Sequence, residues 1–162
     1  MNDTSVSRDE ALLRRAIEVA RRARRGGSHP FGAILVDEAG AVLLEMENGF
    51  LPHRDMTAHA ERLLATEASQ RFGAQRLRAC TVYTSTEPCA MCAAAMYWAG
   101  IGRVVYGLPE EALKDLTGND PENPTLDLPC RVVFAAGQRT VEVTGPLLEE
   151  EARAVHEGAW GH

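Results

Sequence analysis

The sequence predicts a three-layer α/β domain, an α-β-α sandwich in which helices cover both faces of a sheet. Strand-like and helix-like segments alternate along the chain, which is typical of this fold class. A length of 162 residues with 45% hydrophobic and 25% charged residues suits one buried core. We find no internal repeat and no boundary, so residues 1–162 are expected to form one domain.

Residues 7–72 are predicted to form a helix, a hairpin and a second helix. The first helix has apolar positions at helical spacing, a capping box from Ser7 to Glu10 and a Gly-Gly stop. Two compact apolar segments flank an acidic turn, which indicates a β-hairpin, and Gly73 is expected to end the second helix. The expected ranges, in order, are helix 7–25, strand 31–36, strand 41–47 and helix 58–72.

Residues 80–157 continue the alternation. A β-branched strand precedes a helix that Gly100 is expected to close, and a further strand and short helix follow. Residues 117–129 are rich in Pro, Asp and Asn, and long loops in compact domains are often functional. The expected ranges, in order, are strand 80–84, helix 89–99, strand 103–106, helix 109–116, strands 132–135 and 140–143, and helix 147–157.

Charge and hydropathy limit the partners. A formal net charge of −6 argues against a protein that grips a phosphate backbone, so nucleic acid is not an expected partner. No apolar run could span a bilayer and the N-terminus is polar, so we expect a cytoplasmic protein without membrane contact. One arginine cluster on the first helix is either a solvated face or a nucleic-acid contact. Its members are Arg14, Arg15, Arg21, Arg22, Arg24 and Arg25.

The four cysteines suggest metal or catalytic chemistry rather than disulfides. Cys80 and Cys130 stand alone beside apparent strands and are expected to be buried apolar thiols. Cys89 and Cys92 form a C-x-x-C pair directly after Pro88, at the start of a predicted helix. The positive end of that helix favours the thiolates that zinc requires.

A catalytic zinc site is predicted from this pair together with His59 and Glu61. One histidine and two cysteines leave the fourth tetrahedral position open for water, which distinguishes a catalytic zinc from a structural one. His59 and Glu61 are two residues apart, so both can approach one ion only if it lies off the end of their helix. We therefore expect two helix N-termini to converge on one Zn²⁺ per chain, with Glu61 as the proton carrier.

Other interpretations of these motifs are possible. A lone C-x-x-C is also found in redox pairs and in half of a structural zinc finger, and a lone glutamate on a helix is often solvated. The chain has no second C-x-x-C and no H-x-x-x-H, so a closed structural site is hard to build.

The motifs resemble those of the cytidine/deoxycytidylate deaminase superfamily, whose zinc enzymes carry H-x-E and P-C-x-x-C. The resemblance is narrower to the branch with guanine deaminases, cytosine deaminases and tRNA adenosine deaminases, and closest to guanine deaminases. It extends from about Arg8 to Gly107 and is loose beyond. The similar segments are 29–36, 55–61, 83–92 and 95–99.

The resemblance implies a central five-stranded mixed sheet and a homodimer. It also implies that Asn48 hydrogen-bonds the substrate, although a loop-capping role is the alternative. The family pattern further places Phe31 and Ala58 at the substrate. Trp98 is expected either in the pocket or in the core.

Two further residues concern the rim of the expected site. Asp120 corresponds to an acidic residue that guanine deaminases use to read the N–H and amino edge of guanine, and a turn before Pro121 is the alternative. Trp160 is expected either to cover the active site, as C-terminal segments of such enzymes do, or to belong to a frayed terminus. His156 is expected on the surface of the last helix.

The resemblance and the motifs together predict hydrolytic deamination of a small heterocyclic base, most readily guanine to xanthine and ammonia. Cytosine or another aminopyrimidine or triazine is the alternative within the fold. A tRNA adenosine deaminase and a non-catalytic zinc scaffold are weaker alternatives, because the chain is acidic and Glu61 is present.

Overall fold

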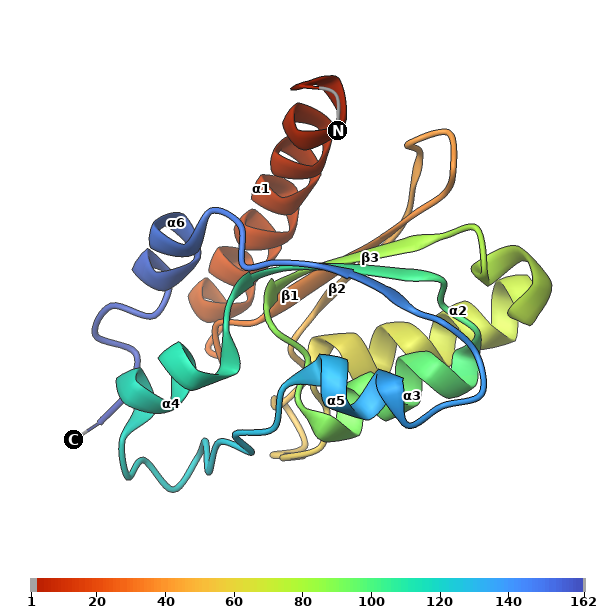
Figure 1. Ribbon diagram of the computed structural model, residues 1–162. Helices are drawn as coiled ribbons and strands as arrows, with labels where there is room; N and C mark the ends of the chain where they lie inside the picture. Colours follow the sequence, from red (N-terminus) through yellow and green to blue (C-terminus); the bar gives the residue numbers. More distant parts are fainter. Residues whose placement is uncertain (1–2, 162) are drawn as a thin grey trace.

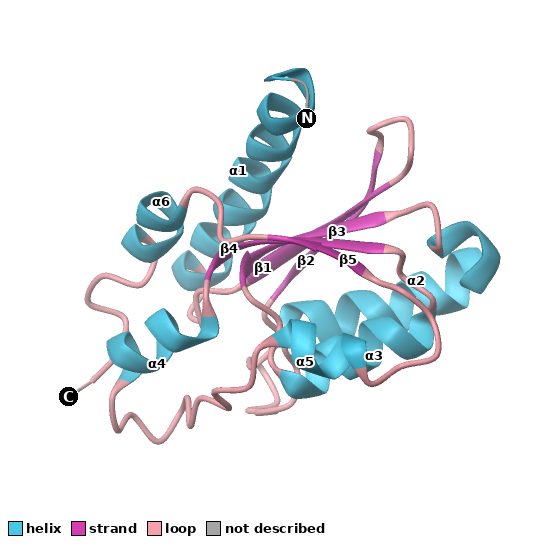
Figure 2. Cartoon of the chain, in the orientation of Figure 1, coloured by secondary structure: helices cyan, strands magenta, loops and turns pink. Residues whose placement is uncertain are grey.

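The computed structural model describes residues 3–161 and places a five-stranded mixed sheet between layers of helices (Figures 1 and 2). The strands are β1 (Gly32–Val36), β2 (Val42–Glu47), β3 (Thr81–Thr86), β4 (Arg103–Leu108) and β5 (Glu142–Thr144). The helices are α1 (Asp3–Arg25), α2 (Ala60–Leu77), α3 (Ala90–Ala99), α4 (Glu110–Thr117), α5 (Cys130–Ala135) and α6 (Glu149–Ala154). The predicted three-layer α/β fold is confirmed.

The sheet has the strand order β2-β1-β3-β4-β5. β1 pairs antiparallel with β2 and with β3, whereas β3, β4 and β5 run parallel. The central strands β1, β3 and β4 are almost wholly buried because both of their faces are covered by helices, although β3 carries several threonines. Because β3 and β4 are parallel neighbours, the segments that follow them begin side by side at one edge of the sheet.

The two faces of the sheet carry separate apolar clusters. α2, α3 and α5 pack on one face, and α1, α4 and α6 pack on the other (Figure 1). Gly32 permits the close approach of α1 to β1, because a Cβ at this position would lie 2.4 Å from the backbone nitrogen of Ala20. The long amphipathic helix predicted from the N-terminal sequence is thereby held against the sheet.

One predicted strand is a helix. Residues 132–135, expected as a strand from their β-branched pair, belong to α5. Cys130 and Phe134 are buried four residues apart, which is a helical period, while Val132 points outward. The backbone N–H of Cys130 donates to the carboxylate of Glu87, 2.8 Å away, so a distant residue satisfies the start of this helix.

Two helix ends also differ from the prediction. Gly73 does leave helical geometry, with φ 74° and ψ 157°, but the chain resumes a helical turn and α2 ends at Leu77, which is buried. The last helix is shorter than predicted and ends at Ala154. The turns beyond it carry His156 and Trp160 into buried positions, so His156 is not the surface residue that we expected.

The six clustered arginines of α1, from Arg14 to Arg25, lie on a solvated face, and each has a partner. The partners are glutamates of β2, α6 or α1 itself, and in one case a backbone carbonyl. Because these charges are paired, the cluster does not present a free cationic surface to phosphate groups. The pairs are Arg14–Glu151, Arg15–Glu45, Arg22–Glu47, Arg21–Glu18, Arg25–Glu18 and Arg24 with the carbonyl of Val155.

Among the described helices, none is both long enough and apolar enough to cross a membrane.

Candidate functional site

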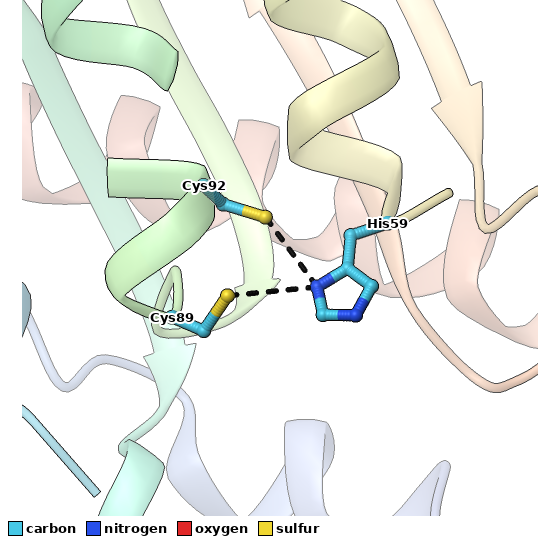
Figure 3. Close-up of side chains that lie close together, drawn as sticks. All are labelled: His59, Cys89 and Cys92. Atoms are coloured by element: carbon cyan, nitrogen blue, oxygen red, sulfur yellow. Dashed lines mark hydrogen bonds between the residues drawn. The ribbon is translucent and has the colours of Figure 1, made fainter. Parts of the chain in front are cut away.

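His59, Cys89 and Cys92 meet where two helices begin. His59 is the N-cap of α2 and Cys89 is the N-cap of α3, so the two helix N-termini converge as the motif spacing predicted. The Nδ1 atom of His59 lies 3.6 Å from Sγ of Cys89 and 3.4 Å from Sγ of Cys92, and both sulfurs point toward it (Figure 3). The three donor atoms all lie within 4.8 Å of one another.

The geometry of the three donors fits a tetrahedral zinc ion. Zinc–nitrogen and zinc–sulfur bonds of about 2.1 and 2.3 Å at a tetrahedral angle would separate N from S by about 3.6 Å. The observed separations are close to this value. Hydrogen bonding from Cys92 and from His59 outweighs burial and lowers the pKa of Cys89 to about 4, which favours the thiolate that binds metal.

Glu61 lies beside these donors without being one of them. It is the second residue of α2 and is only 5% exposed. Burial raises the pKa of Glu61 to about 7, with the negative charge of the Cys89 thiolate adding to the effect. A carboxyl group with such a pKa can take up and release a proton near neutral pH.

Two adjoining cavities open onto the donors. The inner one, of about 30 Å³, contacts His59, Glu61 and Cys89 and has room for a water molecule. The outer one, of about 190 Å³, is small beside the pockets of drug-sized ligands, which start at about 300 Å³. Residues 122–126 of the loop after α4 form part of its wall, so the long loop predicted to be functional does line the site.

Glu110 and Glu87 were missed in the sequence analysis. Glu110 is the first residue of α4 and lines both cavities. Burial raises the pKa of Glu110 to about 9, with further contributions from the charges of Cys89, Glu61 and Glu87. The carboxylate of Glu87 accepts the backbone N–H groups of Glu110 and Cys130 at 3.0 and 2.8 Å. Their positions just after β4 and β3, at the ligand-binding edge of the sheet, were the available signal.

A comparison of the sequence with protein-family models agrees with the donor geometry and the fold. A family model described as the cytidine and deoxycytidylate deaminase zinc-binding region matches residues 6–108, more than half of the chain. The chain belongs to the cytidine and deoxycytidylate deaminase family. The matched residues include His59, Glu61, Cys89 and Cys92, whereas Glu110 and the cavity-lining loop lie beyond them.

Individual relatives within this deaminase family carry different names. The chain is 43% identical over 162 residues to a probable cytosine deaminase of Schizosaccharomyces pombe, covering 99% of this chain and 98% of the relative. It is 41% identical over 98 residues to guanine deaminase of Bacillus subtilis, covering 60% of this chain and 62% of that protein. The solved structure of guanine deaminase from Nitrosomonas europaea has a TM-score of 0.75 at 26% identity, covering 92% of this chain and 82% of that one.

These comparisons confirm the superfamily branch and its five-stranded mixed sheet. They do not single out guanine. The likeness to the probable cytosine deaminase extends over the whole chain, whereas the likeness to the Bacillus subtilis guanine deaminase covers three fifths of it.

Phe31 and Asn48 of this deaminase lie where the resemblance implied, in the cavity walls. The Oδ1 atom of Asn48 accepts the backbone N–H of Phe50 at 2.9 Å, while its Nδ2 atom donates to no other described residue. Asn48 thus caps the loop and still has a donor for a ligand. Ala58 is buried behind the wall, where its carbonyl accepts the N–H of Gly49, and it lines neither cavity.

Trp98 lies in neither of its expected positions. It is 83% exposed on α3, away from both the cavity and the core of its own chain. The sequence indicated that Trp98 belongs to an apolar helix. Which residues of that helix are buried depends on which face of α3 packs against α2 and α5. Trp98 is on the remaining face.

Asp120 does not line the cavity either. Its carboxylate accepts the backbone N–H groups of Glu122 and Gly161 at 2.9 and 2.8 Å. It therefore ties the loop to the C-terminal segment. The loop residues that reach the outer cavity follow it, beginning with Glu122 and Asn123, and Glu122 contacts the ring of His29 at 2.9 Å.

Trp160 is ordered and buried rather than frayed. Its Nε1 donates to Nδ1 of His156 at 3.1 Å, and its ring lies 5.5 Å from that of His29 and 6.0 Å from that of Phe31. His29 and Phe31 line the outer cavity, whereas Trp160 does not. The C-terminal segment thus supports the cavity wall from behind.

Proposed function

We propose that this chain hydrolytically deaminates a free amino-substituted nucleobase. The observation that carries the proposal is the buried Glu61 beside a three-donor cluster that leaves one tetrahedral position open. A small cavity leads to that position. In this reaction water adds to the amino-bearing ring carbon, the carbon–nitrogen bond breaks, and the products are ammonia and a ring carbonyl.

His59, Cys89 and Cys92 would hold zinc, and family membership supports this ion over others. A zinc ion held there would supply a Lewis acid that lowers the pKa of water at the site to about 7. Glu61 takes one proton from the attacking water and delivers it to a ring nitrogen. It then takes the second proton from the new hydroxyl group and delivers it to the amine, which leaves as ammonia while the ring carbonyl forms. Asn48 offers its Nδ2 donor to a ring acceptor, and Phe31 supplies an apolar wall.

Among the free bases, cytosine is favoured over guanine. Asp120 and Trp98, on which the guanine prediction partly rested, lie outside the outer cavity. The full-length likeness to a probable cytosine deaminase agrees with this preference. Guanine remains the second candidate, because the carboxylate of Glu122 lines the cavity and could accept the paired N–H groups of that base.

The remaining alternatives have less support. A tRNA adenosine deaminase needs a cationic surface, and five of the seven arginines of α1 are paired with glutamates. A zinc scaffold without activity does not need a buried carboxyl group beside the donors.

The test is ammonia release by zinc-loaded protein, with cytosine, guanine, adenine and their nucleosides in parallel. Glu61→Gln keeps the shape of the side chain but removes the proton carrier. We expect it to retain its zinc and lose at least about 10²-fold in rate. Glu67→Gln, farther along α2 and paired with Arg71, is the matched control and should keep its activity. Near-normal turnover by Glu61→Gln would refute the mechanism.

A further inference from the structure

Glu110 is a buried carboxyl group for which the described residues provide no partner. Only 4% of the residue is exposed. Its backbone N–H is bound by Glu87, but its side chain makes no hydrogen bond or ion pair with any described residue. Buried polar groups are normally hydrogen-bonded, and an unpartnered carboxyl group opposes folding.

The side chain of Glu110 is available to a ligand. It is one of five residues that line both cavities, and so it lies where the inner cavity joins the outer one. The others are Phe31, His59, Cys89 and Asn123. A molecule that reaches from the outer cavity to the three donors passes Glu110.

The charge around Glu110 limits what that molecule can be. Glu61, Glu87 and Glu122 also line these cavities, and no lysine or arginine does so within residues 3–161. The protein therefore supplies no cation to Glu110. A phosphate group would find no cation among these carboxyl groups, whereas an N–H group would meet an acceptor.

We propose that Glu110 is a substrate-binding residue that accepts a hydrogen bond from an N–H of the base and selects uncharged free bases over nucleotides. This inference rests on the proposed function, since it takes a free base as the ligand. An exocyclic amino group or an unsubstituted ring N–H provides the donor. Asn48 lines the same outer cavity and offers an amide donor, so donor and acceptor atoms of the base would each have a partner.

The melting temperature of Glu110 variants distinguishes a ligand-binding role of this side chain from a role in stabilising the fold. If Glu110 held the fold together, replacing it would lower the melting temperature. If it serves a ligand, the apo protein bears the cost of burying it, and Glu110→Gln and Glu110→Leu should melt at the same temperature or higher. Glu111→Gln changes the exposed neighbour on α4 and is the matched control.

The experiment measures binding in place of turnover. Zinc-loaded Glu61→Gln protein is titrated with cytosine and with guanine by calorimetry, alone and combined with each Glu110 substitution. We expect Glu110→Leu, which removes the acceptor, to weaken binding of the preferred base by about tenfold or more, and Glu110→Gln, which keeps one acceptor oxygen, to weaken it less. Cytidine monophosphate should bind the protein with intact Glu110 more weakly than the free base does. The ratio of the two dissociation constants should move closer to one in the Glu110 variants.

The binding and melting data together support or overturn the proposed role of Glu110. Weaker base binding with an unchanged or higher melting temperature supports the proposal. Unchanged binding overturns it while the proposed function stands, and weaker binding with a lower melting temperature assigns Glu110 a structural role. If no base binds and the wild-type protein releases no ammonia from any base, the proposed function fails and the role of Glu110 fails with it.

Discussion

Glu87 shows how one side chain can position several parts of a site. It follows β3 directly and precedes the Pro-Cys-x-x-Cys segment. One carboxylate oxygen accepts the N–H of Glu110 at the start of α4, and the other accepts the N–H of Cys130 at the start of α5. The first residues of these helices place Glu110 at the cavity and Cys130 in the core.

Replacing Glu87 with glutamine should therefore destabilise the fold. The glutamine side chain keeps one acceptor oxygen, but its NH₂ group would face the backbone N–H of either Glu110 or Cys130. That buried N–H would lose its hydrogen-bond acceptor. We expect the free energy of unfolding to fall by about 1–3 kcal/mol in urea titrations of the zinc-loaded protein. Glu150→Gln, on an exposed position of α6, should change it little. Equal stability of the two variants would show that the double cap contributes nothing.

At the scale of elements, the loop after α4 and the C-terminal segment act together. The loop supplies part of the cavity wall, and Asp120 binds the backbone of Gly161. Trp160 packs behind His29 and Phe31 while its indole N–H donates to His156. This donation requires an unprotonated Nδ1 on His156.

The pairing of His156 with Trp160 should make stability depend on pH. Burial, with the charges of Arg24 and Arg153, lowers the pKa of His156 to about 4, whereas the unfolded value is 6.5. Between these values the unfolded chain binds more protons, so stability present above pH 6.5 is lost as the pH falls toward 4. The loss between pH 7 and 5 should be about 2 kcal/mol.

His156→Asn tests this dependence because its Oδ1 can still accept the indole N–H but does not titrate. The slope of unfolding free energy against pH should be shallower for the variant than for the wild-type protein over this window. Parallel slopes would assign the acid sensitivity to other groups.

At the scale of the whole molecule, one exposed apolar region has no function within the chain. Trp98 on α3 and Val132 on the neighbouring α5 are 83% and 55% exposed. Exposed tryptophan is costly in water and common in protein interfaces. The resemblance to the deaminase family led us to expect a homodimer, and we propose that this helix face forms its interface.

Light scattering after size-exclusion chromatography checks the proposed dimer. The wild-type protein should have twice the mass of one chain, and Trp98→Glu should shift it to the monomer because a carboxylate would be buried without a partner. Val6→Glu, on α1 at the opposite face of the sheet, replaces another exposed apolar side chain and should leave the dimer intact. A monomeric wild-type protein, or a Trp98→Glu dimer, contradicts this interface.

The sequence by itself determined the features that depend on local spacing. The alternation of strands and helices predicted the layers, and the three-residue spacing of Cys89 and Cys92 predicted two donors on one helical turn. The two-residue spacing of His59 and Glu61 required the donors to meet off the ends of two helices. These relations hold because backbone geometry fixes the direction of side chains close in sequence.

Only the tertiary structure decided what depends on contacts distant in sequence. Residues 132–135 became helical because Glu87, far back in the chain, binds the start of α5. Asp120 was turned toward Gly161 and Trp98 toward solvent, and Glu110 reached the cavity because β3 and β4 end side by side. Burial and hydrogen-bond partners are properties of the assembled core, so no local pattern in the sequence could assign them.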